Sequence, residues 1–121
     1  MTFERLGLGK KGEDFAAKLL KKSGYKIKER NYRSPAGEID IIASESDTLA
    51  FIEVKTRSGN SFGMPEEAVN IRKQRQIINA AMYYLQAAKM EEMPARFDVV
   101  TVRVQGKALA GNIIKNAFDI S

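Results

Sequence analysis

Two short acidic motifs lie within what otherwise reads as a pair of neighbouring buried strands. Residues 37–40 (GEID) form the first motif and residues 53–55 (EVK) form the second, each beside an apolar segment. Asp and Glu are poor strand formers, and like charges side by side in a sheet repel each other. A chain that carries carboxylates on such strands needs a compensating partner, and we expect that partner to be a divalent metal ion.

The composition limits the chemistry available to this chain. It has 121 residues, of which 44% are hydrophobic, enough for one globular domain over residues 1–121. It contains no cysteine and no histidine, which excludes disulfides, thiolate nucleophiles, Ser-His-Asp triads and zinc sites built on these residues. Any catalysis must therefore rely on carboxylates, lysine and metal-bound water.

The charge and the hydropathy of the chain indicate its surroundings. A net charge of +5 suits a polyanionic partner, although many ordinary domains are basic. The first residues contain no apolar targeting segment, and no later run is long enough to cross a bilayer. We therefore expect a cytoplasmic protein without a membrane partner.

Apolar periodicity and turn signals predict the order of the elements. The expected helices span residues 7–22 and 65–89, the second with a break near Asn70. Strands are expected over the ranges 25–31, 38–43, 49–56 and 97–104, and 112–118 is either a last short strand or an extended tail. The order α-β-β-β-α-β predicts an α/β fold with a central mixed sheet flanked by helices. The inward face of the second helix is expected to carry Ile71, Gln74, Ile78, Ala81, Leu85 and Ala88.

The register of the central hairpin decides whether the two acidic motifs meet. If residues 45–48 form a four-residue loop, Ala43 lies opposite Ala50. Asp40 then falls opposite Glu53, and Glu38 falls opposite Lys55. Cβ atoms paired in this way lie about 4.5–5.5 Å apart, close enough for two carboxylates to hold one cation.

Two carboxylates with room for water and phosphate oxygens are suited to Mg²⁺ or Mn²⁺. Such an ion polarises a phosphodiester and lowers the pKa of a bound water. Lys55 would orient or deprotonate that water, or neutralise charge in the transition state. The alternative is a solvated cluster of cross-strand ion pairs, Glu38 with Lys55 and Glu53 with a nearby Arg, worth about 0–1 kcal/mol per pair. Spacing alone leaves both interpretations open.

Several separated segments resemble one family. GEDFAAKLL, NYRSPAGEIDII, FIEVKTR and AVNIRKQRQ resemble the bacterial YraN-like family of predicted endonucleases over nearly the whole chain. An Asp on one strand followed by Glu-x-Lys on the next also resembles the PD-(D/E)XK nuclease superfamily, and the family is distantly similar to archaeal Holliday junction resolvases. In this chain Ile39 replaces the Pro of the superfamily's Pro-Asp pair, which leaves the carboxylate in place.

The resemblance implies a restriction-endonuclease-like fold and a metal-dependent nuclease site. It implies that Asp40 and Glu53 bind the metal, that Glu13 completes the acidic cluster, and that Lys55 assists the water. The alternative interpretation of Glu13 is a solvated residue near the start of a helix. Gln74 is a further candidate for hydrogen bonding to a metal-bound water or a phosphate, with a surface-edge glutamine as the alternative. Candidates for phosphate contacts, each of which could equally be a solvated charge, are Arg30, Arg33, Arg57, Arg72, Lys73 and Arg75.

These observations favour a Mg²⁺- or Mn²⁺-dependent endonuclease acting on DNA, with branched or structured molecules among the candidate substrates. The alternatives are an inactive nucleic-acid-binding module with the same fold and a subunit that depends on a protein partner. Because one site per chain must pair with a second to cut two strands symmetrically, a homodimer is a candidate assembly.

Overall fold

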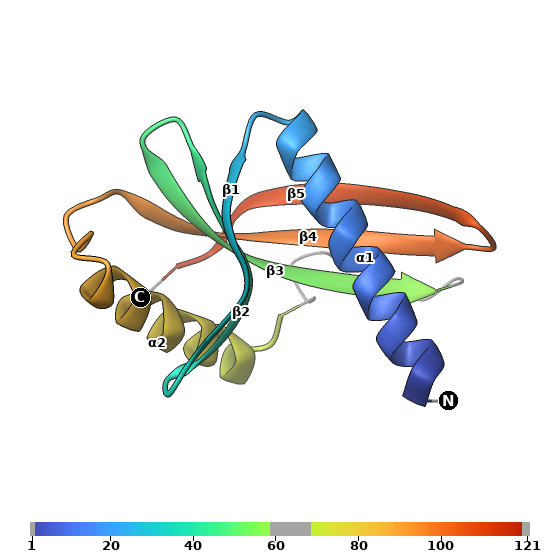
Figure 1. The fold of residues 1–121 in the computed structure, drawn as a ribbon, viewed down its shortest axis with the longest axis horizontal. Helices are drawn as coiled ribbons and strands as arrows, with labels where there is room; N and C mark the ends of the chain where they lie inside the picture. The colour runs from blue at the N-terminus through green and yellow to red at the C-terminus, as the bar shows by residue number, and fades with distance from the viewer. Residues whose placement is uncertain (1, 59–68, 120–121) are drawn as a thin grey trace.

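The computed structural model of the protein describes residues 2–58 and 69–119, which form two helices and five strands (Figure 1). Side chains are described from residue 9 onward in the first helix. The elements in chain order are α1 (Thr2–Lys22), β1 (Lys26–Ser34), β2 (Gly37–Glu45), β3 (Thr48–Ser58), α2 (Ile71–Ala87), β4 (Ala95–Gln105) and β5 (Ala108–Phe118). Among the described residues, no helix is long and apolar enough to cross a membrane.

The five strands form one sheet in the order β1-β2-β3-β4-β5. Neighbouring strands are antiparallel except β3 and β4, which are parallel. A parallel pair needs a crossover, and α2 lies in that connection. In Figure 1, α1 crosses one face of the sheet while α2 lies against the other. The predicted α/β fold with a mixed sheet and flanking helices is confirmed.

Alternating side chains of the strands build a separate core on each face of the sheet. Phe51, Val99 and Ile42 pack with Ile77 and Leu85 of α2 in the first core. In the second core, the buried α1 side chains pack with alternate strand residues. Its members are Ala16, Ala17, Leu20, Tyr25, Ile41, Ala43, Ala50, Ile52, Val100 and Val102. Burying each large apolar side chain stabilises the fold by about 1.5–3 kcal/mol.

Several predicted boundaries need correction. The first strand was expected to end at residue 31 but continues to Ser34, so only a turn separates it from β2 at Gly37. Residues 108–118 form a full strand, because they pair with β4 in a hairpin. Side chains of this last strand cover Phe97 and Val99 of β4. The predicted helical residues 65–68 lie outside the described part of the chain.

The second helix is rotated relative to the prediction. Its N-cap is Asn70, the site of the predicted break, and the Asn70 side chain accepts a hydrogen bond from the Lys73 backbone N–H at 2.9 Å. Ile71 was expected to face inward but is 64% exposed. The buried residues of α2 are Ile77, Ala80, Ala81 and Leu85, because the sheet contacts the helix along a stripe displaced by part of a turn.

Close backbone packing sets the position of α1 on the sheet. Gly12 lies directly over Thr56 of β3, and a Cβ atom at residue 12 would collide with Thr56 Oγ1. Gly12 therefore lets the helix approach the strand more closely than any other residue would. Thr56 follows Lys55, so this contact holds the middle of α1 beside the end of β3 that carries the lysine.

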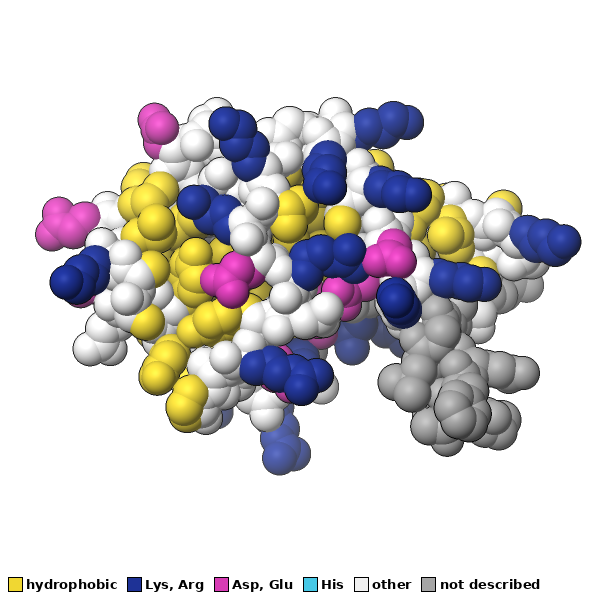
Figure 2. Space-filling model, viewed as in Figure 1, with side chains coloured by type: hydrophobic (Ala, Val, Ile, Leu, Met, Phe, Trp, Pro, Cys, Tyr) yellow, Lys and Arg dark blue, Asp and Glu magenta, His cyan; other side chains and the backbone are white. Residues whose placement is uncertain are grey.

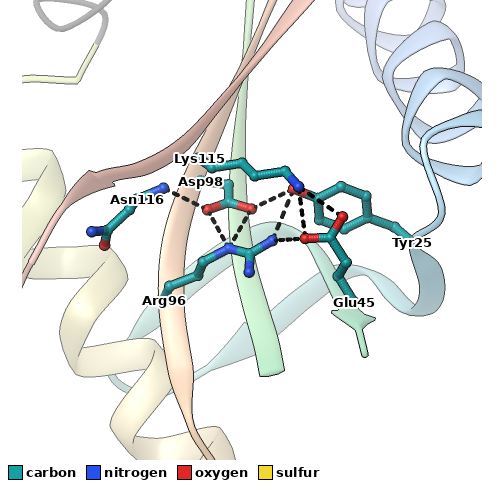
Figure 3. A network of polar contacts seen from close by, with 6 residues as sticks. All are labelled: Tyr25, Glu45, Arg96, Asp98, Lys115 and Asn116. Carbon is teal, nitrogen blue, oxygen red and sulfur yellow. Dashed lines mark hydrogen bonds and ion pairs between the residues drawn. The ribbon is translucent and has the colours of Figure 1, made fainter. Parts of the chain in front are cut away.

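A buried polar network joins distant segments at the other end of β3 (Figure 3). Asp98 is fully buried and accepts hydrogen bonds from Tyr25 Oη at 2.8 Å, Arg96 Nε at 3.0 Å and the Asn116 backbone N–H at 2.9 Å. Arg96 also contacts Glu45 at 2.6 Å, and Lys115 contacts Glu45 at 2.8 Å. The hydrogen bonds and the ion pair with Arg96 offset the cost of removing the Asp98 carboxylate from water.

We expect Asp98→Asn to lower the free energy of unfolding by about 3 kcal/mol, because it leaves the Arg96 guanidinium without its buried partner. Urea unfolding followed by circular dichroism measures the change. Glu92→Gln, at an exposed position before β4, is the control and should change stability by less than about 0.5 kcal/mol. Equal stability of the two variants would contradict the structural role of Asp98.

Candidate functional site

The site lies where β2 and β3 separate. Their ladder runs from the pair Glu45 and Thr48 to the pair Ile41 and Ile52. Beyond this pair, the Asp40 carboxylate replaces a backbone carbonyl as the hydrogen-bond acceptor. The backbone N–H of Val54 on β3 donates to Asp40 Oδ2 at 2.8 Å. The side chain of Asp40 is thus held in the opening between the two strands.

The predicted register is confirmed, since Ala43 lies opposite Ala50. The turn is shorter than predicted: Glu45 pairs with Thr48, so the loop contains two residues, with Ser46 at φ 53°. A two-residue loop and a four-residue loop give the same register, which explains why the prediction held. The expected pairing of Glu38 with Lys55 is wrong, because the ladder between β2 and β3 ends at Ile41 and Ile52. Glu38 lies opposite Arg33 of β1 and forms an ion pair with it at 3.4 Å.

Glu53 is a carboxyl group that the fold removes from water. It is 6% exposed on the central strand. Burial, and then the negative charge of the neighbouring Asp40, raise the pKa of Glu53 from 4.5 to about 8. Lys73 at the start of α2 opposes this rise, with its Nζ 4.0 Å from Glu53 Oε2. Glu53 is therefore expected to keep its proton at neutral pH, beside the carboxyl group of Asp40.

An open pocket of about 630 Å³ lies beside this pair and is lined by Asp40, whereas the buried Glu53 is not among its lining residues. Asp40 and Lys55 line it from the strands, and Glu13 lines it from α1. The remaining lining residues are Gly9, Val54, Thr56 and Arg57. The structure thus brings the predicted residues Asp40, Lys55, Glu13 and Arg57 to one pocket.

Glu13 does not join the other two carboxylates. Its Oε1 lies 3.2 Å from Arg30 Nη2, and the neighbouring Asp14 contacts the same nitrogen at 2.6 Å. In residues 2–58 and 69–119, no three acidic side chains form a group that could hold a metal ion together. The three-carboxylate cluster implied by the resemblance is therefore not assembled in this structure.

The predicted phosphate contacts occupy three different places. Arg33 is 78% exposed, and with Arg30 it lines a second pocket of about 630 Å³ that shares Gly9 and Glu13 with the first. Arg72 and Arg75 are exposed on α2, while Lys73 of the same turn points to Glu53. Figure 2 shows Lys and Arg side chains spread over the face that carries α1 and β1, with acidic side chains among them.

Gln74 is half-buried, and its side-chain Nε2 donates to the Val69 carbonyl oxygen at 2.9 Å. One donor of the amide therefore stabilises the chain entering α2. The suggested contact of Gln74 with a bound water or phosphate stays a prediction.

Three contributions to the site were not predicted. The Val54 N–H orients Asp40, Lys73 lies over Glu53, and Asp14 shares Arg30 with Glu13. The contact of Asp14 with Arg30 could have been predicted, because Glu13 and Asp14 are adjacent in the sequence and lie near one side of α1. The other two depend on strand separation and on helix placement, which local sequence does not encode.

The fold and the site define an α/β protein whose mixed sheet opens at its centre around an Asp, a Glu and a Lys. Residues 12–102 match the family described as "Uncharacterised protein family UPF0102". The UPF0102 protein of Syntrophotalea carbinolica is 48% identical over 99% of this chain and 98% of its own length. That of Moorella thermoacetica is 46% identical, over 98% of this chain and 100% of its own length. The chain belongs to the UPF0102 family, which confirms the YraN-like resemblance at the family level.

The raised pKa of Glu53 predicts a pH dependence of stability. The unfolded chain loses this proton near pH 4.5, whereas the folded protein keeps it to about pH 8, so stability should fall as pH rises between these values, by up to about 1.4 kcal/mol per pH unit. Urea unfolding at pH 5, 6 and 7 in the presence of a chelator measures the slope. Glu53→Gln should flatten it, and Glu91→Gln should not. An unchanged slope in Glu53→Gln would contradict the assignment.

Proposed function

We propose that the protein is a Mg²⁺- or Mn²⁺-dependent endonuclease of the PD-(D/E)XK superfamily that hydrolyses DNA phosphodiester bonds in the cytoplasm. The observation that carries the proposal is the pair of Asp40 and Glu53 at the strand opening, with Lys55 on the wall of the same pocket. Four-way and other branched DNA molecules are the preferred candidate substrates, in line with the similarity to junction resolvases.

The residues present fit a divalent cation. Glu53 is buried next to Asp40, and the repulsion between the two carboxylates disfavours their joint ionisation unless a cation lies between them. Both supply oxygen ligands, which Mg²⁺ and Mn²⁺ prefer, and the open pocket leaves space for water. When bound, such an ion would polarise the phosphodiester and acidify a water molecule.

The side chains around the pair have separate tasks. The Val54 N–H fixes the orientation of Asp40. Lys55 lines the pocket beside Asp40, where its ammonium group can orient the attacking water or neutralise charge on the phosphate. Arg57 at the same pocket and Arg33 at the adjoining one supply positive charge for flanking phosphates.

One observation favours a second candidate function, a DNA-binding module without catalysis. Glu13 is paired with Arg30, so only two of the three expected carboxylates face each other. In such a module, loss of Asp40 or Lys55 would leave DNA binding unchanged, while loss of Arg33 would weaken it and reduce its salt dependence.

Incubation of the protein with linear, single-stranded, flapped and four-way DNA in Mg²⁺ or Mn²⁺ tests the proposed reaction. We expect cleavage that a chelator abolishes and that Asp40→Asn or Lys55→Met reduces by about a hundredfold or more, because each removes a group at the reacting phosphate. Lys107→Met, in the exposed turn between β4 and β5, is the control. Equal products from wild type and Asp40→Asn would reveal a contaminating nuclease and contradict the proposal.

Metal binding can be measured without DNA. We expect saturating Mn²⁺ to raise the melting temperature of the wild type by roughly 5–10 °C, because the ion binds only the folded site. The effect should weaken at acidic pH, where a proton competes for Glu53. Asp40→Asn should lose the stabilisation, whereas Glu91→Gln should keep it. A melting temperature that Mn²⁺ leaves unchanged at pH 8 would contradict the metal site.

A further inference from the structure

Glu13 stands on the boundary between the two pockets. It lines both of them, together with Gly9, whereas Asp40 and Lys55 line only the first and Arg30 only the second. The Glu13 side chain is 16% exposed and points to Arg30. A carboxylate in this position can reach partners on either side by changing its side-chain torsions alone.

The backbone of Glu13 has little freedom to move. Its neighbour Gly12 is packed against Thr56 with no space for a Cβ atom, and Ala16 and Ala17 on the following turn are buried in the core. The helix therefore holds the Cα atom of Glu13 in place beside the pocket of Asp40 and Lys55. Only the side chain of Glu13 can therefore change its direction.

Arg30 has two acidic partners of unequal strength. Its Nη2 lies 2.6 Å from Asp14 Oδ1 and 3.2 Å from Glu13 Oε1. Asp14 can thus keep the guanidinium paired when Glu13 leaves, and a partly exposed ion pair of this kind costs only about 0–1 kcal/mol to break.

We propose that Arg30 is a positioning residue that holds Glu13 away from Asp40 and Glu53 in the metal-free protein, and that Asp14 retains Arg30 when Glu13 turns to a cation in the first pocket. This inference rests on the proposed function, because it requires a divalent ion at Asp40 and Glu53. It assigns Arg30 a role distinct from a phosphate contact. The metal site is complete only when Glu13 leaves Arg30 and contacts the divalent ion.

The test is the Mn²⁺ affinity of the full-length protein without DNA, measured by titration calorimetry for wild type, Arg30→Met, Glu13→Gln and the double variant. Removal of the competing guanidinium should raise the Mn²⁺ affinity about fivefold, the equivalent of about 1 kcal/mol. In the Glu13→Gln background the same change should have no effect, because the carboxylate it releases is absent. Lys28→Met removes a basic side chain two positions earlier on β1 and should leave the affinity unchanged.

The outcomes separate this inference from the proposed function. A gain in Arg30→Met that disappears in the double variant supports the role of Arg30. A gain that persists in the double variant, or that Lys28→Met reproduces, is a long-range charge effect and overturns it, as does no gain at all. If wild type and Arg30→Met bind no Mn²⁺, both this inference and the proposed metal site fail. Binding that depends on Asp40 but not on Arg30 leaves the proposed site standing and overturns only the inference.

Discussion

The buried carboxylate of Asp98 is the interaction on which the arrangement of the sheet depends. It accepts hydrogen bonds from Tyr25 before β1, from Arg96 on its own strand and from the backbone of Asn116 on β5. Arg96 extends the network to Glu45 at the end of β2. Because an unpaired buried charge is strongly destabilising, these segments must meet in one geometry for the chain to fold. The network thereby ties β4 to the end of β2, to β5 and to the segment before β1.

The candidate site has the opposite electrostatic character. Asp98 is surrounded by donors, whereas Glu53 is buried beside another carboxylate with a lysine 4.0 Å away as partial compensation. Such an arrangement lowers stability at neutral pH, and strongly perturbed carboxyl groups are concentrated at functional sites. The separation of β2 from β3 makes the arrangement possible, because it gives Asp40 a backbone donor and opens the pocket beside Lys55.

Local and hairpin-level features could be predicted from the sequence. Alternation and turn position gave the correct pairing of Ala43 with Ala50, since a hairpin brings together residues that are close in the chain. The predicted inward position of Ile71 was wrong, because periodicity defines an apolar stripe while the sheet decides how the helix is rotated. Lys73 was expected among the phosphate contacts, which stays a prediction, while its position 4.0 Å from Glu53 was not foreseen.

The sequence by itself determined the chemical inventory of this protein: carboxylates and a lysine on two adjoining strands, no histidine or cysteine, and membership of the UPF0102 family. Tertiary structure decided which of these groups meet. It left Asp40 and Glu53 together, turned Glu13 to Arg30, and brought Lys73 across from α2. The reason is physical: residue spacing defines contacts within one element, whereas contacts between α1, the sheet and α2 depend on close packing and on the requirement that every buried charge finds a partner.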